Sequence, residues 1–355
     1  MSFHRACIVD ISSQVLPFTW GLVKRLKAKD ISVEYIGSST NYNSGFLEDM
    51  KGDVDTIHLF DISSSTGVNI IWRWLNIFRF YIFLFRKSSE FDEIIVQFPM
   101  VLPFDLLYFG FFGRKISYLV HNPYPHSSNR RVDLSTLMLS LLSNKIYFLT
   151  DYVKDQYQSI YTRVNSSNMQ VVGHGLIPID PKDHLLPYRK TLYSPLILTF
   201  WGNVKPYKGV TRLASYIQNN YRADIIERLE IHGKVDPSLQ FEISGFSSDK
   251  ILINDSFLSS EEVQSLFTGN RLFILPYEAA SQSGILYTLI FYGQIFISSD
   301  AGDTSQFLKS NGLGELVFDI HNPSTLYKSI LYCVDNIEHI SLKLTQLRQE
   351  LLNDS

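Results

Sequence analysis

The segment from Gly202 to Gly209 combines a flexible turn with two cations. Gly202 lets the backbone approach a ligand closely, while Lys205 and Lys208 lie near the expected start of a helix, where free amides favour anions. Positive groups there would stabilise the charge that develops on a diphosphate leaving group. From spacing alone, an ordinary solvated turn with two surface lysines is an equally good interpretation.

A second segment, residues 275–284, lies between an expected strand and an expected helix. Its small residues would expose amides at the helix N-terminus, a second seat for an anion, and Glu278 could accept hydrogen bonds from sugar hydroxyls. The simpler alternative is a helix cap beside a solvated glutamate.

His121 follows an expected strand of the first half of the chain. Its reference pKa would let it orient a sugar hydroxyl or share a proton. A histidine satisfied within its own loop is the commoner outcome. His174-Gly175, after the strand that ends at Val172, is a weaker signal of the same kind.

Alternating strands and helices must position these residues. We predict an α/β protein with two Rossmann-like, doubly wound domains facing a cleft, and ligands beyond the carboxyl ends of the strands. The expected domains are residues 1–180 and 181–336. Residues 337–355 form a C-terminal helix that could pack back on the first domain, and the Pro-rich stretch 178–194 is the expected linker.

Composition narrows the class of protein. The chain has 355 residues and a net charge of −3, which argues against nucleic acid as the main partner. Cys7 and Cys333 are expected to be buried free thiols, and no cysteine or histidine spacing predicts a metal site. The apolar start ends too early for a signal peptide, so we expect a soluble, cytoplasmic protein.

Residues 68–86 are aromatic and apolar but contain Arg73 and Arg79, which disfavour a membrane span. We expect either a buried helix or a helix seated at the inner face of the plasma membrane.

Taken in order, these motifs resemble the GT-B glycosyltransferases, most closely glycosyltransferase family 4. The resemblance rests on residues 200–209, the loop 281–284, and the segments 172–175, 254–262 and 291–302. It implies a metal-independent hexosyltransferase without cofactors, which moves a sugar from a UDP- or GDP-sugar to a glycan or lipid-linked glycan in bacterial surface polysaccharide synthesis.

The resemblance also assigns the first domain, residues 1–180, to the acceptor side and the second, residues 181–336, to the nucleotide-sugar donor, and it assigns roles to residues. Lys208 matches the diphosphate-binding lysine, and Lys205 stands in for an arginine because position 203 is Asn203. His121 matches a histidine near the transferred sugar. The donor-binding set is completed by Gly202, Ser281, Gln282, Ser283 and Gly284.

One departure leaves alternatives open. Two glutamates of the family pattern align with Ala280 and Thr288 here, and Glu278 is displaced by two residues. The stereochemistry is therefore open, and a non-catalytic subunit that binds sugar nucleotides is the runner-up. A sugar-nucleotide epimerase is less favoured, because it would need an acidic cluster that the sequence lacks.

Overall fold

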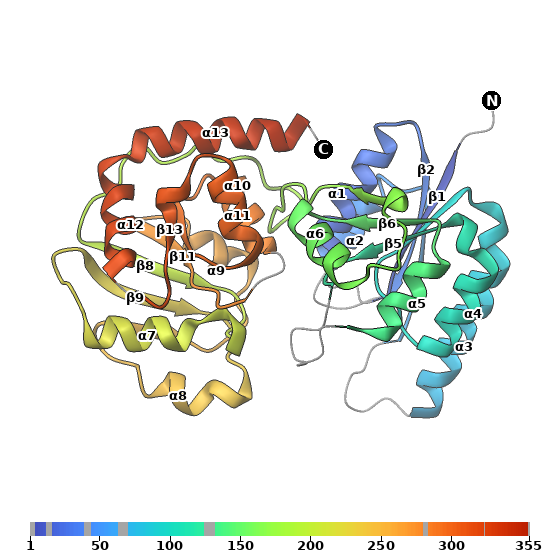
Figure 1. Ribbon diagram of the computed structural model, residues 1–355, viewed down its shortest axis with the longest axis horizontal. Coiled ribbons are helices and arrows are strands. Elements are labelled where there is room, and N and C mark those ends of the chain that lie inside the picture. Colours follow the sequence, from blue (N-terminus) through green and yellow to red (C-terminus); the bar gives the residue numbers. More distant parts are fainter. Residues whose placement is uncertain are drawn as a thin grey trace. The chain divides into compact units, whose positions relative to one another are not determined.

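The computed structural model describes residues 4–11, 16–38, 44–62, 70–123, 132–279, 283–322 and 324–353. The chain divides into two compact units, the first ending at Gly175 and the second beginning at Leu176 (Figure 1). Each unit is an α/β body with its own parallel sheet and its own hydrophobic core.

The first unit has a seven-stranded parallel sheet in the order β3-β2-β1-β4-β5-β6-β7. Strand β1 pairs with β2 on one side and with β4 on the other, so the strand order reverses between β1 and β4. Ligands of doubly wound sheets bind at this switch point. The strands are β1 Arg5–Asp10, β2 Ser32–Ser38, β3 Thr56–Phe60, β4 Glu93–Val96, β5 Ile116–Val120, β6 Lys145–Phe148 and β7 Met169–Val171.

Helices cover both faces of this sheet because side chains alternate along each strand. In β1, Ile8 packs with α1 (Leu16–Lys27) and α2 (Ser44–Met50), whereas Cys7 and Val9 belong to the core on the opposite face. That second core contains buried side chains of four helices: α3 Ile70–Lys87, α4 Leu102–Phe112, α5 Leu134–Leu142 and α6 Asp151–Ile160.

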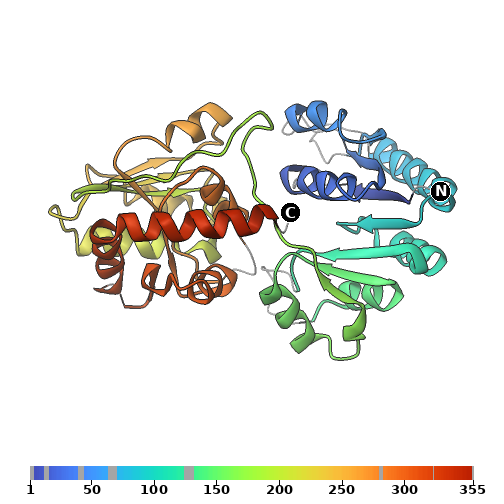
Figure 2. The same cartoon turned by 90° about the horizontal axis from the view of Figure 1, so that it is seen from above.

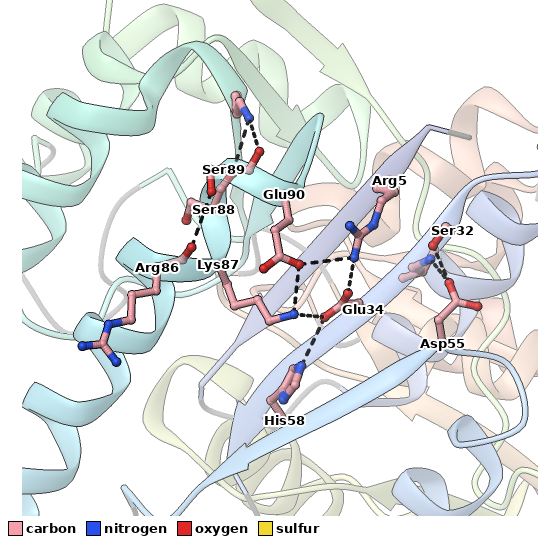
Figure 3. A network of polar contacts seen from close by, with 12 residues as sticks. Arg5, Ser32, Glu34, Asp55, His58, Arg86, Lys87, Ser88, Ser89 and Glu90 are labelled. Carbon is pink, nitrogen blue, oxygen red and sulfur yellow. Dashed lines mark hydrogen bonds and ion pairs between the residues drawn. The ribbon is translucent and has the colours of Figure 1, made fainter. Parts of the chain in front are cut away.

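Charged groups at the amino ends of β1, β2 and β3 pair with one another (Figure 3). Glu34, whose side chain is buried, accepts from Arg5 at 2.7 Å and lies 3.1 Å from His58 Nε2. Lys87, at the end of α3, lies 3.0 Å from Glu90 and 3.8 Å from Glu34. This network ties α3 to the sheet at the edge opposite the carboxyl ends.

The second unit repeats the pattern with a six-stranded parallel sheet in the order β10-β9-β8-β11-β12-β13. Its switch point lies between β8 and β11. The strands are β8 Leu196–Trp201, β9 Ile226–His232, β10 Ile251–Asn254, β11 Arg271–Leu275, β12 Phe296–Ser299 and β13 Val317–Phe318. The helices are α7 Val210–Asn219, α8 Gln240–Ser244, α9 Ser260–Ser265, α10 Gly284–Phe291, α11 Gly302–Ser310, α12 Ser324–Asp335 and α13 Ile337–Asn353.

The Pro-rich segment 178–194 is irregular, as predicted, but it is packed onto the second unit rather than free. Tyr188 is buried in that core and donates to the Ile290 carbonyl at 3.2 Å. Arg348 of α13 donates to the Leu186 carbonyl at 2.6 Å. Helix α13, red in Figure 2, buries Ile340 in the same core.

The predicted alternation of strands and helices is present in both units. Helix α9 begins with a capping box, in which Ser259 and Glu262 bond reciprocally. The prediction omitted α2, α4 and α8. Helix α4 is apolar almost throughout and contains Pro103 and Gly110, so it lacks the polar face that marks a surface helix.

Cys7 and Cys333 are buried free thiols, as predicted. None of the helices in the described part of the chain is both long and apolar enough to cross a membrane.

Candidate active site

The turn at residues 202–209 lies at the switch point of the second sheet, directly after β8. Gly202 has φ +123°, and a Cβ there would come within 2.6 Å of Ile285 Cδ1 and 3.3 Å of Lys208 Nζ. Gly209 has φ +64°, and a Cβ there would overlap the Pro276 carbonyl. Both positions therefore require glycine, because each combines a positive φ with a close neighbour.

The turn is fastened to the loop after β11. The Tyr207 carbonyl accepts from the backbone amides of Glu278 at 2.9 Å and Ala279 at 3.3 Å. The two segments that the sequence placed after separate strands thus lie side by side at one edge of the sheet.

Lys208 ends the short 3-10 helix Pro206–Lys208 and carries a half-buried amine. Its Nζ lies 5.8 Å from the ring centroids of both Phe200 and Tyr277. Burial, with a smaller contribution from the charge of nearby Lys205, lowers the pKa of Lys208 to about 8. Among the described residues no carboxylate forms an ion pair with this amine, so it is a cation held without a counter-ion.

Helix α10 begins beside this amine, since Ile285 of its first turn contacts Gly202. Ser283 occupies the N-cap position but makes no capping bond with its side chain; its hydroxyl lies 3.0 Å from the Tyr277 hydroxyl instead. The amides of Gly284 and Ile285 are therefore available to an anion. Ser281 and Gln282 lie outside the described residues.

Asn203 and Lys205 are exposed on the same turn. Val204 between them is buried and forms an isolated bridge with Val235 after β9. That bridge fixes the backbone while the two neighbouring side chains remain accessible to a ligand.

Glu278 is held by a cation from α7. Its carboxylate accepts from Arg212 Nε at 2.7 Å, and Arg212 Nη1 lies 3.4 Å from His321 Nδ1. Arg212 was not anticipated from the sequence, because nothing in the spacing links residues 66 positions apart. A role for Glu278 toward a sugar would require it to exchange this partner.

In the first unit, His121 follows β5 and is buried. Its ring is stacked on Phe98, with centroids 4.4 Å apart and planes 5° apart, and it meets Phe18 edge-on. Burial lowers the pKa of His121 to about 3, with a further contribution from His174. The reference pKa used above is therefore wrong for this site, and the imidazole is neutral at pH 7.

His121 and Gln97 line one cavity of about 200 Å³ at the carboxyl ends of β4 and β5. Within the described residues, His121 Nε2 and Gln97 Oε1 are buried without a hydrogen-bond partner. Gln97 Nε2 donates to Thr19 Oγ1 at 2.9 Å, and Thr19 donates to Asp10 at 3.1 Å. These hydrogen bonds orient the Gln97 amide, so that its free oxygen can accept a hydrogen bond from a hydroxyl of a ligand.

The cavity lining also contains Asp133, whose carboxylate caps α5 by accepting hydrogen bonds from the backbone amides of Ser135 and Thr136. Nearby, Arg25 lies against Gly175, and its charge contributes to a lowered His174 pKa of about 4, behind the larger effect of burial. Gln97, Thr19 and Arg25 were missed by sequence reasoning; the position of Gln97 directly after a strand was the signal that could have found it.

Among the described residues, no three side chains of the metal-ligating types come together as a metal site. The chemistry available at the carboxyl edges of the two sheets is thus a cation with free amides in the second unit and, in the first, the neutral groups of Gln97 and His121 beside the carboxyls of Asp10 and Asp133.

The comparisons with known proteins find similarity in structure but not in sequence. No protein-family model matches the sequence, and no curated protein matches it. A glycosyltransferase from Rickettsia africae superposes with a TM-score of 0.63 at 16% identity, covering 100% of this chain and 94% of that one. HepE of Anabaena, solved with UDP and glucose, gives 0.64 at 11% identity over 98% and 95% of the two chains.

A protein of Listeria monocytogenes described as a UDP-N-acetylglucosamine 2-epimerase gives 0.58 at 12% identity, covering 98% of this chain and 91% of that one. The strand orders and these likenesses agree on one architecture, although identities this low establish no shared activity. This chain has the GT-B fold of the glycosyltransferases.

Proposed function

We propose that the protein is a glycosyltransferase that takes its sugar from a nucleoside-diphosphate sugar. The observation that carries the proposal is Lys208, an amine without a counter-ion at the second switch point, next to the start of α10. A cation without a carboxylate partner costs stability unless an anion binds, and a diphosphate fits both the charge and the free amides.

In the proposed reaction, a hydroxyl oxygen of the acceptor attacks the anomeric carbon of the donor sugar. The bond from that carbon to the diphosphate oxygen breaks, its electron pair stays on the diphosphate, and the hydroxyl proton leaves with the departing group or to solvent. Lys208 and the α10 amides would stabilise the growing negative charge, so no metal ion is required.

The first-unit cavity would hold a neutral hydroxyl-bearing group. His121 is neutral at pH 7, and Gln97 offers an oriented acceptor, so the pair suits a sugar hydroxyl better than a charged group. His121 would therefore orient a hydroxyl rather than supply a proton from an imidazolium.

We also propose finer assignments on the strength of the family resemblance. These are a hexosyl group, a UDP or GDP carrier, and a glycan or lipid-linked acceptor of a bacterial surface polysaccharide. They include work at the cytoplasmic face of the membrane, with peripheral contact through residues 68–86.

A non-catalytic subunit that binds sugar nucleotides is the alternative. Two observations favour it: Thr288 stands where the family pattern has a glutamate, and Glu278 is already paired with Arg212. Both hypotheses predict donor binding, so turnover separates them.

The test is to incubate the protein with a panel of UDP- and GDP-hexoses and measure binding by calorimetry and release of nucleoside diphosphate. We expect one donor to bind and to be turned over, slowly by water and faster with an acceptor, and Lys208→Ala to lose both. Binding without release in any combination would favour the alternative. No binding at millimolar donor would overturn both.

A further inference from the structure

Helix α3 is apolar well beyond the face that it buries. Ile77, Phe80 and Leu84 point into the core of the first unit. Outside that buried face, Trp74 and Phe78 are 52% and 54% exposed. A surface helix in water normally turns charged and polar residues outward, so this outward face requires an explanation.

The two neighbouring helices continue the same surface. Helix α4 packs on both α3 and α5, and the three helices lie side by side (Figure 1). Phe111 of α4 is 71% exposed, and Leu141 of α5 is 55% exposed. More than half of the exposed large apolar side chains in the described part of the chain lie on these three helices. A contiguous patch of this kind marks a binding surface.

The exposed charges on these helices have one sign. Arg73, Arg79 and Arg86 are exposed on α3. The acidic residue within the three helices, Asp105, is turned inward, where its carboxylate accepts from the Tyr81 hydroxyl at 2.6 Å and the Met100 amide at 2.8 Å. The outward surface therefore combines aromatic rings and arginines without a carboxylate from these helices.

We propose that this three-helix face, formed by α3, α4 and α5, docks on the surface of a lipid bilayer that contains anionic lipids. Tryptophans and arginines suit the boundary between headgroups and acyl chains, since their apolar parts enter the bilayer while the charged heads meet lipid phosphates. The inference deepens the proposed function by naming the surface on which an acceptor would be met, and it extends the contact beyond residues 68–86.

Vesicle flotation tests the proposal without donor or acceptor, so its failure leaves the proposed transferase activity untouched. We expect the purified protein to float with phosphatidylcholine vesicles that contain phosphatidylglycerol and to bind pure phosphatidylcholine less well. Raising the salt to 1 M should weaken binding, because the screening length shortens to about 3 Å.

Paired variants locate the contact. Trp74→Ser with Phe78→Ser should lower the partition coefficient on the order of tenfold, and Phe111→Ser with Leu141→Ser should lower it by a similar factor. Arg79→Gln with Arg86→Gln should abolish the preference for anionic vesicles. Phe241→Ser on α8 is the matched control, because Phe241 is 95% exposed in the second unit and should leave binding unchanged.

All these side chains are exposed, so folding should persist, which circular dichroism and the melting temperature would verify. The proposal is overturned if the protein does not float with anionic vesicles, or if the α4 and α5 variants bind like the parent. It is also overturned if light scattering shows a dimer in solution that the same substitutions dissociate, since the occupant would then be a second copy.

Discussion

The carboxyl edges of the two sheets share a topology but differ in charge. In the second unit, the switch point presents Lys208, a cation for which the described part of the chain supplies no carboxylate partner. In the first, it presents Gln97 and His121, two buried neutral groups with free hydrogen-bonding atoms. In the proposed reaction, the second unit would bind the anionic diphosphate and the first unit an uncharged hydroxyl, at equivalent places in the two sheets.

The amino edge of the first sheet supplies a second contrast. Arg5, Glu34 and Lys87 there are paired with opposite charges, as expected of groups that serve the fold. Within the described ranges Lys208 has no carboxylate partner, which is what its proposed role as an anion-binding group would require.

The largest expected effect follows from removing the cation of the second unit. Lys208→Ala should lower kcat/KM for the donor by about 10² to 10³, because the substitution removes the positive charge that would face the leaving diphosphate. Steady-state kinetics with the preferred donor would measure it. Lys208→Met should bind no better, yet melt at a higher temperature, since it removes a desolvated charge. A lower melting temperature would mean that Lys208 supports the fold.

Adding a side chain at Gly202 should weaken donor binding at the same site indirectly. Gly202→Ala would place a Cβ against Ile285 and near the Lys208 amine, at a φ that alanine disfavours. We expect donor affinity to fall by about 10- to 100-fold, as a turn strained by 1–3 kcal/mol displaces the amine. Gly269→Ala is the matched control, because Gly269 has a similarly positive φ of +73° but no atom within 4 Å of an added Cβ, and calorimetry would compare the two.

A substitution in the first-unit cavity should change the binding of the acceptor and not that of the donor. Gln97→Leu should raise KM for the acceptor about fivefold, with donor binding unchanged, because one hydrogen bond of about 1 kcal/mol is lost from a buried cavity. Equal losses in donor and acceptor binding would place both ligands in one unit and erase the contrast.

The two sites should also differ in how their function depends on pH. The Lys208 pKa of about 8 lies below its ordinary value, so the cation is present below pH 8 and lost above it. Donor affinity should therefore fall roughly tenfold from pH 7 to pH 9. The His121 pKa of about 3 means that its protonation should not alter activity between pH 5 and pH 7. A pH profile of kcat/KM would show both limits.

The smallest effect is expected at Arg212 and Glu278. Their ion pair is partly exposed, so Arg212→Gln should change the stability by less than about 1 kcal/mol. If Glu278 acts on the sugar, releasing it should leave activity equal or higher. A large loss of activity would show that Arg212 itself contacts the ligand.

The sequence predicted the second-unit turn well because its signals are local. A strand, Gly202 and the Lys208-Gly209 pair lie within a few residues, so their types already imply the geometry. The contact between Tyr207 and Glu278, the Arg212 partner and the Asp10–Thr19–Gln97 chain join distant segments, and no periodicity encodes them. Helix α4 was missed for a related reason, since its outward face carries the apolar pattern of a core.

The account depends most directly on Lys208 as the diphosphate ligand. Calorimetry of UDP and GDP binding at pH 8.5, in buffers of different ionisation enthalpy, measures the protons taken up. With a free pKa of about 8, the wild-type protein should take up about 0.8 proton as the diphosphate recharges the amine. Lys208→Arg should bind with no uptake. Equal proton uptake in the two proteins, or undiminished binding by Lys208→Ala, would contradict the account.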